Sequence, residues 1–343
     1  MTPIELQRKL QIWCQEDYDG SIGISDIKKD IEFLSRELYN EYDVTKHGGH
    51  GDFIFRLARW IGSAETDDDQ KSLFVLLRHL IFFGDNELDA AYRTAFSRHV
   101  VSWLMNDQKL NVFSTTADAD LKSILNRTLL TEITDSFGLR SFLGKNNLHG
   151  RPRYTWYAHR KSWQRQQFID TEIVRNLGEN ISHIVLFEDF VGSGSQVEPF
   201  LKLACNVDRN IKVLFCPMYI CPAGAQLALR LQRQYRNFSF SPVLEIPQKC
   251  FITKNAIDGE HPDFPTIRKT ANVVHPKVVI PGSPQDFGPF GFDGVNQQGA
   301  TGGFIVTSTN CPDNTIPLIH RRRAGYWEPL FLRTSREALE VTP

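Results

Sequence analysis

The sequence lacks paired cysteines. No two of its six cysteines have the Cys-x-x-Cys spacing that is typical of zinc sites and of thioredoxin-like redox centres. Several of them lie among apolar neighbours, as buried free thiols commonly do. We therefore expect reduced thiols in the protein core. The six are Cys14, Cys205, Cys216, Cys221, Cys250 and Cys311.

The sequence also lacks long apolar runs and an excess of charge of either sign. Its longest apolar run is far shorter than the roughly 20 residues that a helix needs to cross a bilayer. Residues 1–10 are polar and of mixed charge, unlike a signal peptide. With 39 basic and 40 acidic residues the formal net charge is -1, which gives no overall attraction to nucleic acid. A cytoplasmic protein with no membrane association is expected.

Signatures of several enzyme classes are missing as well. The sequence has no Walker A loop, no serine nucleophile elbow and no zinc-finger spacing. His47 and His50 are flanked by glycines and have no cysteine or carboxylate cluster at ligand spacing beside them. This favours a flexible loop between helices over a metal site.

Residues 1–106 have the apolar spacing of helices. Thr66 is suited to cap one of these helices, because three aspartates follow it in the first turn. No strand is expected between them, so residues 1–106 are predicted to form an α-helical N-terminal region. The predicted helices cover about 6–14, 27–38, 52–61, 66–84 and 87–105.

From residue 107 onward the pattern changes to strands that alternate with helices. This alternation is typical of a parallel, doubly wound sheet flanked by helices, with ligands at the carboxyl edge of the strands. A final strand over 303–310 continues into a proline-rich segment that we expect to act as a rigid lid. The other predicted strands are 110–113, 184–187, 211–220 and 238–246, and the predicted helices are 121–133, 197–204 and 223–236.

The strand at 184–187 leads into the most informative motif. Glu188 and Asp189 stand where that strand would end, and a loop of small residues follows up to Gln196. Loop amides and a helix N-terminus suit a phosphate group, and carboxylates accept hydrogen bonds from sugar hydroxyls. A generic strand–loop–helix turn with solvated acids is the alternative, but the fixed spacing of acids, loop and helix favours a sugar-phosphate site.

This motif resembles the diphosphate-sugar signature of type I phosphoribosyltransferases. The resemblance implies that Glu188 and Asp189 hold the ribose hydroxyls, with Mg²⁺ bound beside them through the substrate. It also implies a phosphoribosyltransferase-like α/β domain over residues 107–343, with a C-terminal lid segment. The implied phosphate loop consists of Val191, Gly192, Ser193, Gly194, Ser195 and Gln196.

The chain departs from the family pattern at two loop positions. Purine-specific members often carry an aspartate that acts as a base toward the purine. This chain has Gly192 at that position, which has no side chain to act as a base. The threonine that usually closes the loop is Gln196 here, which still donates hydrogen bonds.

The resemblance further suggests residues that contact pyrophosphate. Ser114 and Thr115 would lie in the loop after the first strand, although any Ser/Thr-rich helix cap looks similar. Arg160 and Lys161 would belong to a mobile basic loop that offsets the charge of the leaving group. The alternative for this basic stretch is a solvated strand edge or a surface that binds nucleic acid or protein.

The C-terminal segment 310–317, followed by Trp327, is similar to a phosphoribosyltransferase-like subfamily from bacterial anti-phage conflict loci. Some members are retron effectors that act beside a reverse transcriptase and its RNA/DNA product. Asn310, Asp313 and Asn314 are candidates for an acceptor pocket, and local Asx turns are the equal alternative. Trp327 is expected in the core.

Three functions are compatible with these features. The first is transfer of a phosphoribosyl group from phosphoribosyl diphosphate or a related nucleotide, in anti-phage defence. The second is a non-catalytic nucleotide sensor or scaffold that binds a partner protein, such as a DNA-binding protein, or nucleic acid. The third is a DNA-binding adaptor that uses the basic segment 151–165.

Overall fold

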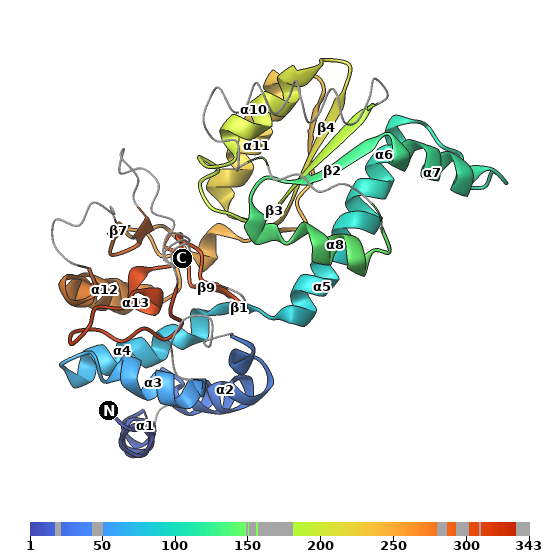
Figure 1. Cartoon of the computed structure of the whole chain (residues 1–343). Helices are drawn as coiled ribbons and strands as arrows, with labels where there is room; N and C mark the ends of the chain where they lie inside the picture. Colours follow the sequence, from blue (N-terminus) through green and yellow to red (C-terminus); the bar gives the residue numbers. More distant parts are fainter. Residues whose placement is uncertain are drawn as a thin grey trace, which may run out of the picture. The chain divides into compact units, whose positions relative to one another are not determined.

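The contacts of the chain divide it into two compact units (Figure 1). The sheet unit is Asn86–Pro247, and the helical unit combines Met1–Asp85 with Gln248–Pro343. This division differs from the boundary expected after residue 106, because C-terminal side chains share one hydrophobic core with the N-terminal helices. The structure, a computed structural model, describes residues 1–17, 22–42, 51–148, 150, 156, 181–279, 287–292, 302–308 and 310–333.

The helical unit begins with helices that have polar N-terminal caps. Thr2 and Glu5 form a reciprocal capping box at α1 (Pro3–Glu16). Thr66 Oγ1 accepts a hydrogen bond of 3.1 Å from the Asp69 amide and caps α4 (Asp67–Leu76), as the sequence predicts. None of the described helices combines the length and the apolar character needed to cross a bilayer. The remaining helical elements are α2 (Ile24–Glu37), α3 (Phe53–Ile61), α12 (Phe264–Val278), α13 (Pro317–His320) and the 3-10 turns Tyr39–Glu41, Leu77–His79 and Gln248–Cys250.

A short parallel strand pair joins the two separate stretches of the chain that form this unit. β1 (Ile81–Phe83) pairs with β9 (Ile305–Thr307), so that Ile81 lies opposite Ile305. The expectation of an N-terminal region without a strand is therefore wrong. The same pairing explains why the strand predicted near residue 303 belongs to the helical unit and not to the main sheet. A small hairpin of β7 (Phe287–Gly288) and β8 (Gly291–Phe292) completes the described strands of the unit.

Two tryptophans from opposite ends of the chain share one acceptor in the helical core. The indole nitrogens of Trp60 and Trp327 donate to the carbonyl of Leu318 at 2.7 and 2.8 Å. Both rings are almost completely buried. The predicted core role of Trp327 is confirmed, and its burial depends on an N-terminal helix.

The sheet unit contains a parallel sheet with the order β2-β3-β4-β5, and β6 also pairs with β4. All of these pairs are parallel, which confirms the predicted fold class. Along the path β2-β3-β4-β5 neighbouring strands are consecutive in the chain, so the order does not reverse along it. The expectation of a doubly wound order is wrong for them. The strands are β2 (Thr128–Glu132), β3 (His183–Val191), β4 (Lys212–Ile220), β5 (Phe238–Phe240) and β6 (Leu244–Glu245).

Helices cover both faces of the sheet (Figure 1). On one face, α10 (Glu198–Val207) and α11 (Pro222–Gln234) pack on side chains such as Ile184 and Phe215. On the other face, Phe187 stacks on Phe137 with ring centroids 5.0 Å apart and contacts Phe142 at 4.4 Å. This second face is covered by α5 (Asp85–Thr94), the π-helix Ala95–Val101, α6 (Ser102–Asp107) and α8 (Leu139–Lys145).

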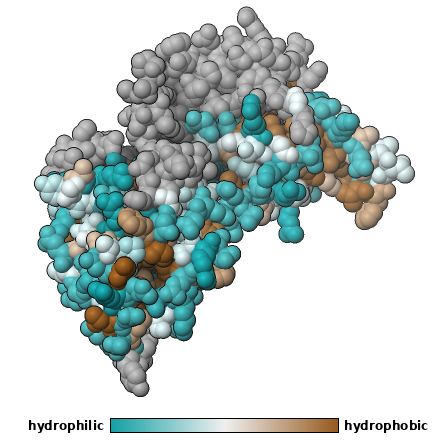
Figure 2. All heavy atoms as spheres, turned by 60° about the horizontal axis from the view of Figure 1, so that its bottom comes forward, coloured by the Kyte–Doolittle hydropathy of each residue, from teal (hydrophilic) through white to brown (hydrophobic). Residues whose placement is uncertain are grey.

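The segment before β2 differs from the sequence prediction. Residues 110–113 form a turn and not a strand, and α7 (Ala117–Asn126) ends before β2 begins. Val112 and Phe113 are 52% and 93% exposed, and Figure 2 shows apolar surface at the end of the sheet unit where α7 lies. Leu129 lies in β2, and Ile133 directly follows this strand. Every residue of β2 is buried, so the strand lacks the alternation that would have distinguished it from a helix in the sequence.

The cysteines agree with the expectation of core thiols. All six are free, and Cys205, Cys216, Cys221 and Cys311 are buried. Burial raises the pKa of the Cys221 thiol to about 12, so this group stays protonated at neutral pH.

Candidate active site

Glu188 and Asp189 lie near the carboxyl end of β3, where the sequence placed them, and each is held by the neighbouring strand end. The Thr134 amide donates to Glu188 Oε2 at 3.0 Å, and the Thr134 hydroxyl donates to Oε1. Ser136 Oγ donates to Asp189 Oδ1 at 2.8 Å. Glu188 is 4% exposed, whereas Asp189 is half-buried. Asp189 is therefore the acid that a ligand reaches more directly.

The loop after β2 brings these hydroxyl groups to the acids. Glu132, the last residue of β2, accepts a hydrogen bond of 2.8 Å from the Leu139 amide and thereby fixes the start of α8. Gly138 makes the turn into that helix with a φ of 70°. Thr134 and Ser136 lie between these two anchors, so the loop is short and firmly held at both ends.

Thr134 and Ser136 are not among the site residues predicted from the sequence. Their signal is the run Thr134–Gly138, which combines hydroxyl, acidic and glycine residues directly after an apolar stretch. The helix predicted over 121–133 ends directly before this run, so the predicted loop after the first sheet strand lies about twenty residues too early.

Ser114 and Thr115 lie in the turn that leads into α7, before the first strand of the sheet and not after it. Ser114 Oγ contacts Thr116 Oγ1 at 2.9 Å and accepts from the Thr116 amide at 3.2 Å. Their predicted contact with pyrophosphate depended on a strand at 110–113, which the structure does not have. The local turn is the arrangement observed.

The glycine- and serine-rich segment after β3 forms a compact loop before α10. The Gly194 carbonyl accepts hydrogen bonds from the amides of Val197 and Glu198, at 3.1 and 2.9 Å, and Gly194 has a φ of 84°. Ser193 Oγ lies 3.1 Å from Ser195 Oγ. Within the described part of the chain, the amides of Ser193, Gly194 and Gln196 donate to no acceptor. An oxyanion at this loop would supply the acceptors that these amides need.

The loop rests on the first turn of α11. The Cys221 amide donates to the Val191 carbonyl at 2.8 Å, which joins the end of β3 to the residue before α11. A Cβ atom on Gly224 would lie 2.7 Å from the carbonyl oxygen of Gly192, closer than such atoms approach. Gly224 therefore allows the loop backbone to pack directly on the helix.

Tyr92 of α5 holds the loop after β2 through a hydrogen bond. Its hydroxyl donates to the Phe137 carbonyl. Burial raises the pKa of Tyr92, and the carboxylates of Asp189 and Glu132 raise it further. The phenol therefore stays protonated and keeps this hydrogen bond, which holds the segment that carries Ser136.

The other predicted site residues are not described in the sheet unit, which contains Glu188 and Asp189. Arg160 and Lys161 lie outside the described residues. Asn310, Asp313 and Asn314 belong to the helical unit. These three residues have partners inside the helical unit. Asn310 Oδ1 accepts from the Cys311 amide at 2.9 Å, and Arg333 donates to Asp313 at 2.8 Å. The Asn314 carbonyl accepts from the Gly303 amide at 3.0 Å.

A parallel sheet with an acidic strand end and a glycine- and serine-rich loop before a helix defines a phosphoribosyltransferase-like protein. The chain belongs to the family described as PRTase-CE, whose model matches residues 57–333. The match begins within α3 and therefore includes most of the helical unit, well before the region in which motifs could be recognised from the sequence. No curated protein and no solved structure matches the chain significantly.

The substitution Thr134→Val tests how Glu188 is held. Valine keeps the shape of the side chain but removes the hydroxyl donor, so one oxygen of a buried carboxylate loses a partner. We expect the free energy of unfolding to fall by about 1–3 kcal/mol, measured by urea denaturation. Thr115→Val is the matched control, because Thr115 is exposed, and we expect its change to stay within about 0.5 kcal/mol. Equal losses in both variants would contradict a specific role of Thr134.

Proposed function

We propose that the sheet unit binds phosphoribosyl diphosphate, or a related nucleotide, and transfers its phosphoribosyl group to an acceptor. The observation that carries this proposal is the arrangement at two adjacent strand ends. There Thr134 and Ser136 hold Glu188 and Asp189 in fixed positions, directly before the loop 191–196. One element of the site thus suits a pentose and the next suits a phosphate.

Each part of the site has a distinct task in this proposal. The loop amides and the N-terminus of α10 bind the 5′-phosphate and keep it away from the reacting carbon. Asp189 and Glu188 accept hydrogen bonds from the ribose hydroxyls and orient the anomeric carbon. Ser136 is a positioning residue, because it holds Asp189 through a hydrogen bond of 2.8 Å.

The reaction replaces one bond at the anomeric carbon. A nucleophilic atom of the acceptor forms a bond to that carbon while the bond to the pyrophosphate oxygen breaks, and pyrophosphate leaves with the electron pair. Gly192 has no side chain that could take a proton from the acceptor. The proton therefore has to leave from the acceptor to another base or to water.

Mg²⁺ fits the donor set at this site, because carboxylate and hydroxyl oxygens are ligands that this ion accepts. Asp189 and Glu188 would hold it indirectly, through the ribose hydroxyls of the substrate. When bound, the ion would offset the charge that develops on the departing diphosphate.

The turnover experiment mixes the full chain with Mg²⁺, phosphoribosyl diphosphate and single candidate acceptors, first nucleobases and then nucleic acids, and follows pyrophosphate. We expect release above the acceptor-free background with at least one acceptor, and loss of that release in Asp189→Asn. Saturable binding of phosphoribosyl diphosphate without release for every acceptor would contradict catalysis.

A nucleotide sensor or scaffold is the second candidate function, and Gly192 is the feature that favours it. A site that binds the ligand without a base near the anomeric carbon could pass a signal to a partner protein or nucleic acid. In that case binding of phosphoribosyl diphosphate should change the affinity for the partner, and Asp189→Asn should remove both the binding and the change.

The biological setting belongs to the same proposal and depends on the likeness of segment 310–317 to retron effectors. We propose a cytoplasmic anti-phage effector that a reverse transcriptase and its RNA/DNA product hold inactive. Expression of the chain alone should slow bacterial growth, and coexpression of a retron reverse transcriptase with its RNA/DNA product should relieve this. A DNA-binding role of segment 151–165 would instead appear as binding that weakens steeply with salt.

A further inference from the structure

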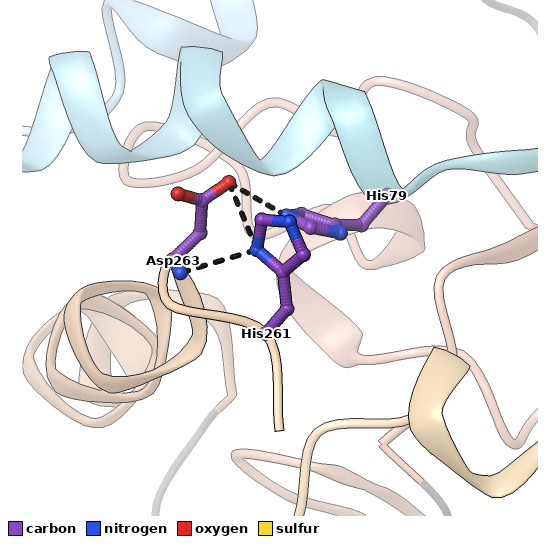
Figure 3. Close-up of side chains that lie close together, drawn as sticks. All are labelled: His79, His261 and Asp263. Carbon is purple, nitrogen blue, oxygen red and sulfur yellow. Dashed lines mark hydrogen bonds and ion pairs between the residues drawn. The ribbon is translucent and has the colours of Figure 1, made fainter. Parts of the chain in front are cut away.

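Two histidines and an aspartate come together in the helical unit, away from any residue used above (Figure 3). His79 is the last residue of the 3-10 turn Leu77–His79, between α4 and β1. His261 and Asp263 lie just before α12, and Asp263 directly precedes the first residue of this helix without a side-chain capping hydrogen bond to it. One potential ligand atom from each side chain lies within 4.8 Å of the others.

The two separations known in this cluster lie on either side of the one that a tetrahedral metal ion imposes on its ligands. Asp263 Oδ2 lies 2.9 Å from His79 Nε2 and 3.4 Å from His261 Nδ1. A tetrahedral zinc ion with bonds of about 2.0–2.1 Å separates its nitrogen and oxygen ligands by roughly 3.3 Å. We propose that His79, His261 and Asp263 bind a divalent transition-metal ion such as Zn²⁺.

The surroundings hold the three side chains in place and leave one side open. The His79 ring contacts the rings of His261 and Phe264, with centroids 4.5 and 4.9 Å apart. The side chains of His79 and Asp263 are 11% and 13% exposed, whereas that of His261 is 41% exposed. An ion can therefore enter from the side of His261 and keep a water molecule as its fourth ligand.

Without an ion, hydrogen bonds connect the same atoms. His79 Nε2 donates to Asp263 Oδ2 at 2.9 Å, and the Asp263 amide donates to His261 Nδ1 at 3.2 Å. Arg78 Nη1 also donates to Asp263 Oδ2, at 3.1 Å. A metal ion would replace the imidazole proton and the amide contact, and it would have to compete with the arginine. A purely hydrogen-bonded cluster is the alternative that the experiment must separate.

Metal binding would join two segments of the helical unit that lie far apart in the sequence. His79 comes from the N-terminal part of the chain, and His261 and Asp263 come from the part that follows the sheet unit. An ion bound by all three would join the turn before β1 to the start of α12. It would bind the folded unit only, and so it would stabilise the fold by mass action.

The test uses the full chain, treated with a chelator and then titrated with Zn²⁺ or Co²⁺. We expect one bound equivalent per chain, a higher melting temperature and visible absorption bands for Co²⁺. His261→Gln should weaken Zn²⁺ binding by at least about tenfold, since even changes to outer-shell partners of a metal have that effect. Asp258→Asn, an exposed acid on the same segment, should leave the binding unchanged.

Three results would overturn the proposal. The first is the absence of saturable binding for both ions. The second is equal affinity of the parent chain and His261→Gln, whose half-exposed side chain can be replaced without unfolding. The third is loss of binding in a His47→Gln/His50→Gln variant, since that would place the bound ion at the other histidine pair.

Discussion

Replacing Glu188 and Asp189 together with alanine is expected to lower the affinity for phosphoribosyl diphosphate by at least about 100-fold. A hydrogen bond to a charged group contributes about 1.5–3 kcal/mol, and two of them would be lost. Each 1.4 kcal/mol corresponds to a factor of about ten in affinity. Titration calorimetry with phosphoribosyl diphosphate and Mg²⁺ measures this loss, and pyrophosphate release should fall with it.

The control has to separate a lost ligand from a lost fold. Glu188 is buried and takes two hydrogen bonds from Thr134, so its removal also costs stability. Asp189→Asn alone avoids this problem, because Asp189 is half-buried and asparagine keeps its shape. Asp208→Asn removes a charge from an exposed position just before β4, at the opposite edge of the sheet, and should bind normally. Unchanged affinity in the folded double variant would refute the proposed site.

Gly224→Ala is expected to weaken ligand binding through the backbone of the phosphate loop. The added methyl group would meet the Gly192 carbonyl oxygen at 2.7 Å and the Val191 side chain at 2.9 Å. Since both neighbours belong to the end of β3 and the loop, the loop has to move. We expect a loss of about 1–3 kcal/mol in stability from this overpacking, and at least a tenfold loss of affinity, measured by urea denaturation and calorimetry.

Gly144→Ala is a matched control, for which the expected change in stability has the opposite sign. Gly144 lies in α8, and nothing lies within 4 Å of a Cβ atom at that position. Alanine favours a helix over glycine by up to about 1 kcal/mol, so this variant should be slightly more stable than the parent. A loss of stability in both variants would show that the cost at Gly224 is not a clash with the loop.

The motif from residue 184 to residue 204 could be predicted from the sequence because every part of its signal is local. An apolar run, two acids, a small-residue loop and a helical repeat follow one another along the chain, and the structure has β3, the loop and α10 in that order. Thr66 was predicted as a helix cap for the same reason, since a cap acts within one turn.

The partners of this motif could not be predicted, because they depend on which strands lie side by side. Thr134 reaches Glu188 only because β2 pairs with β3, and β2 is buried on both faces and has no alternating pattern. The pairing of Ile81 with Ile305 likewise joins distant segments by backbone hydrogen bonds that carry no residue signature. The convergence of His79 with Asp263 follows from the same distant packing.

The composition of the helical unit from both ends of the chain has a consequence for synthesis on the ribosome. The sheet unit is one continuous stretch, Asn86–Pro247, so it can fold as soon as that stretch has emerged from the exit tunnel. The first helices must wait, because the indole of Trp60 has its acceptor at Leu318, 258 residues later in the chain. The nascent protein therefore carries an unfinished apolar surface until the segment around Leu318 has been synthesised.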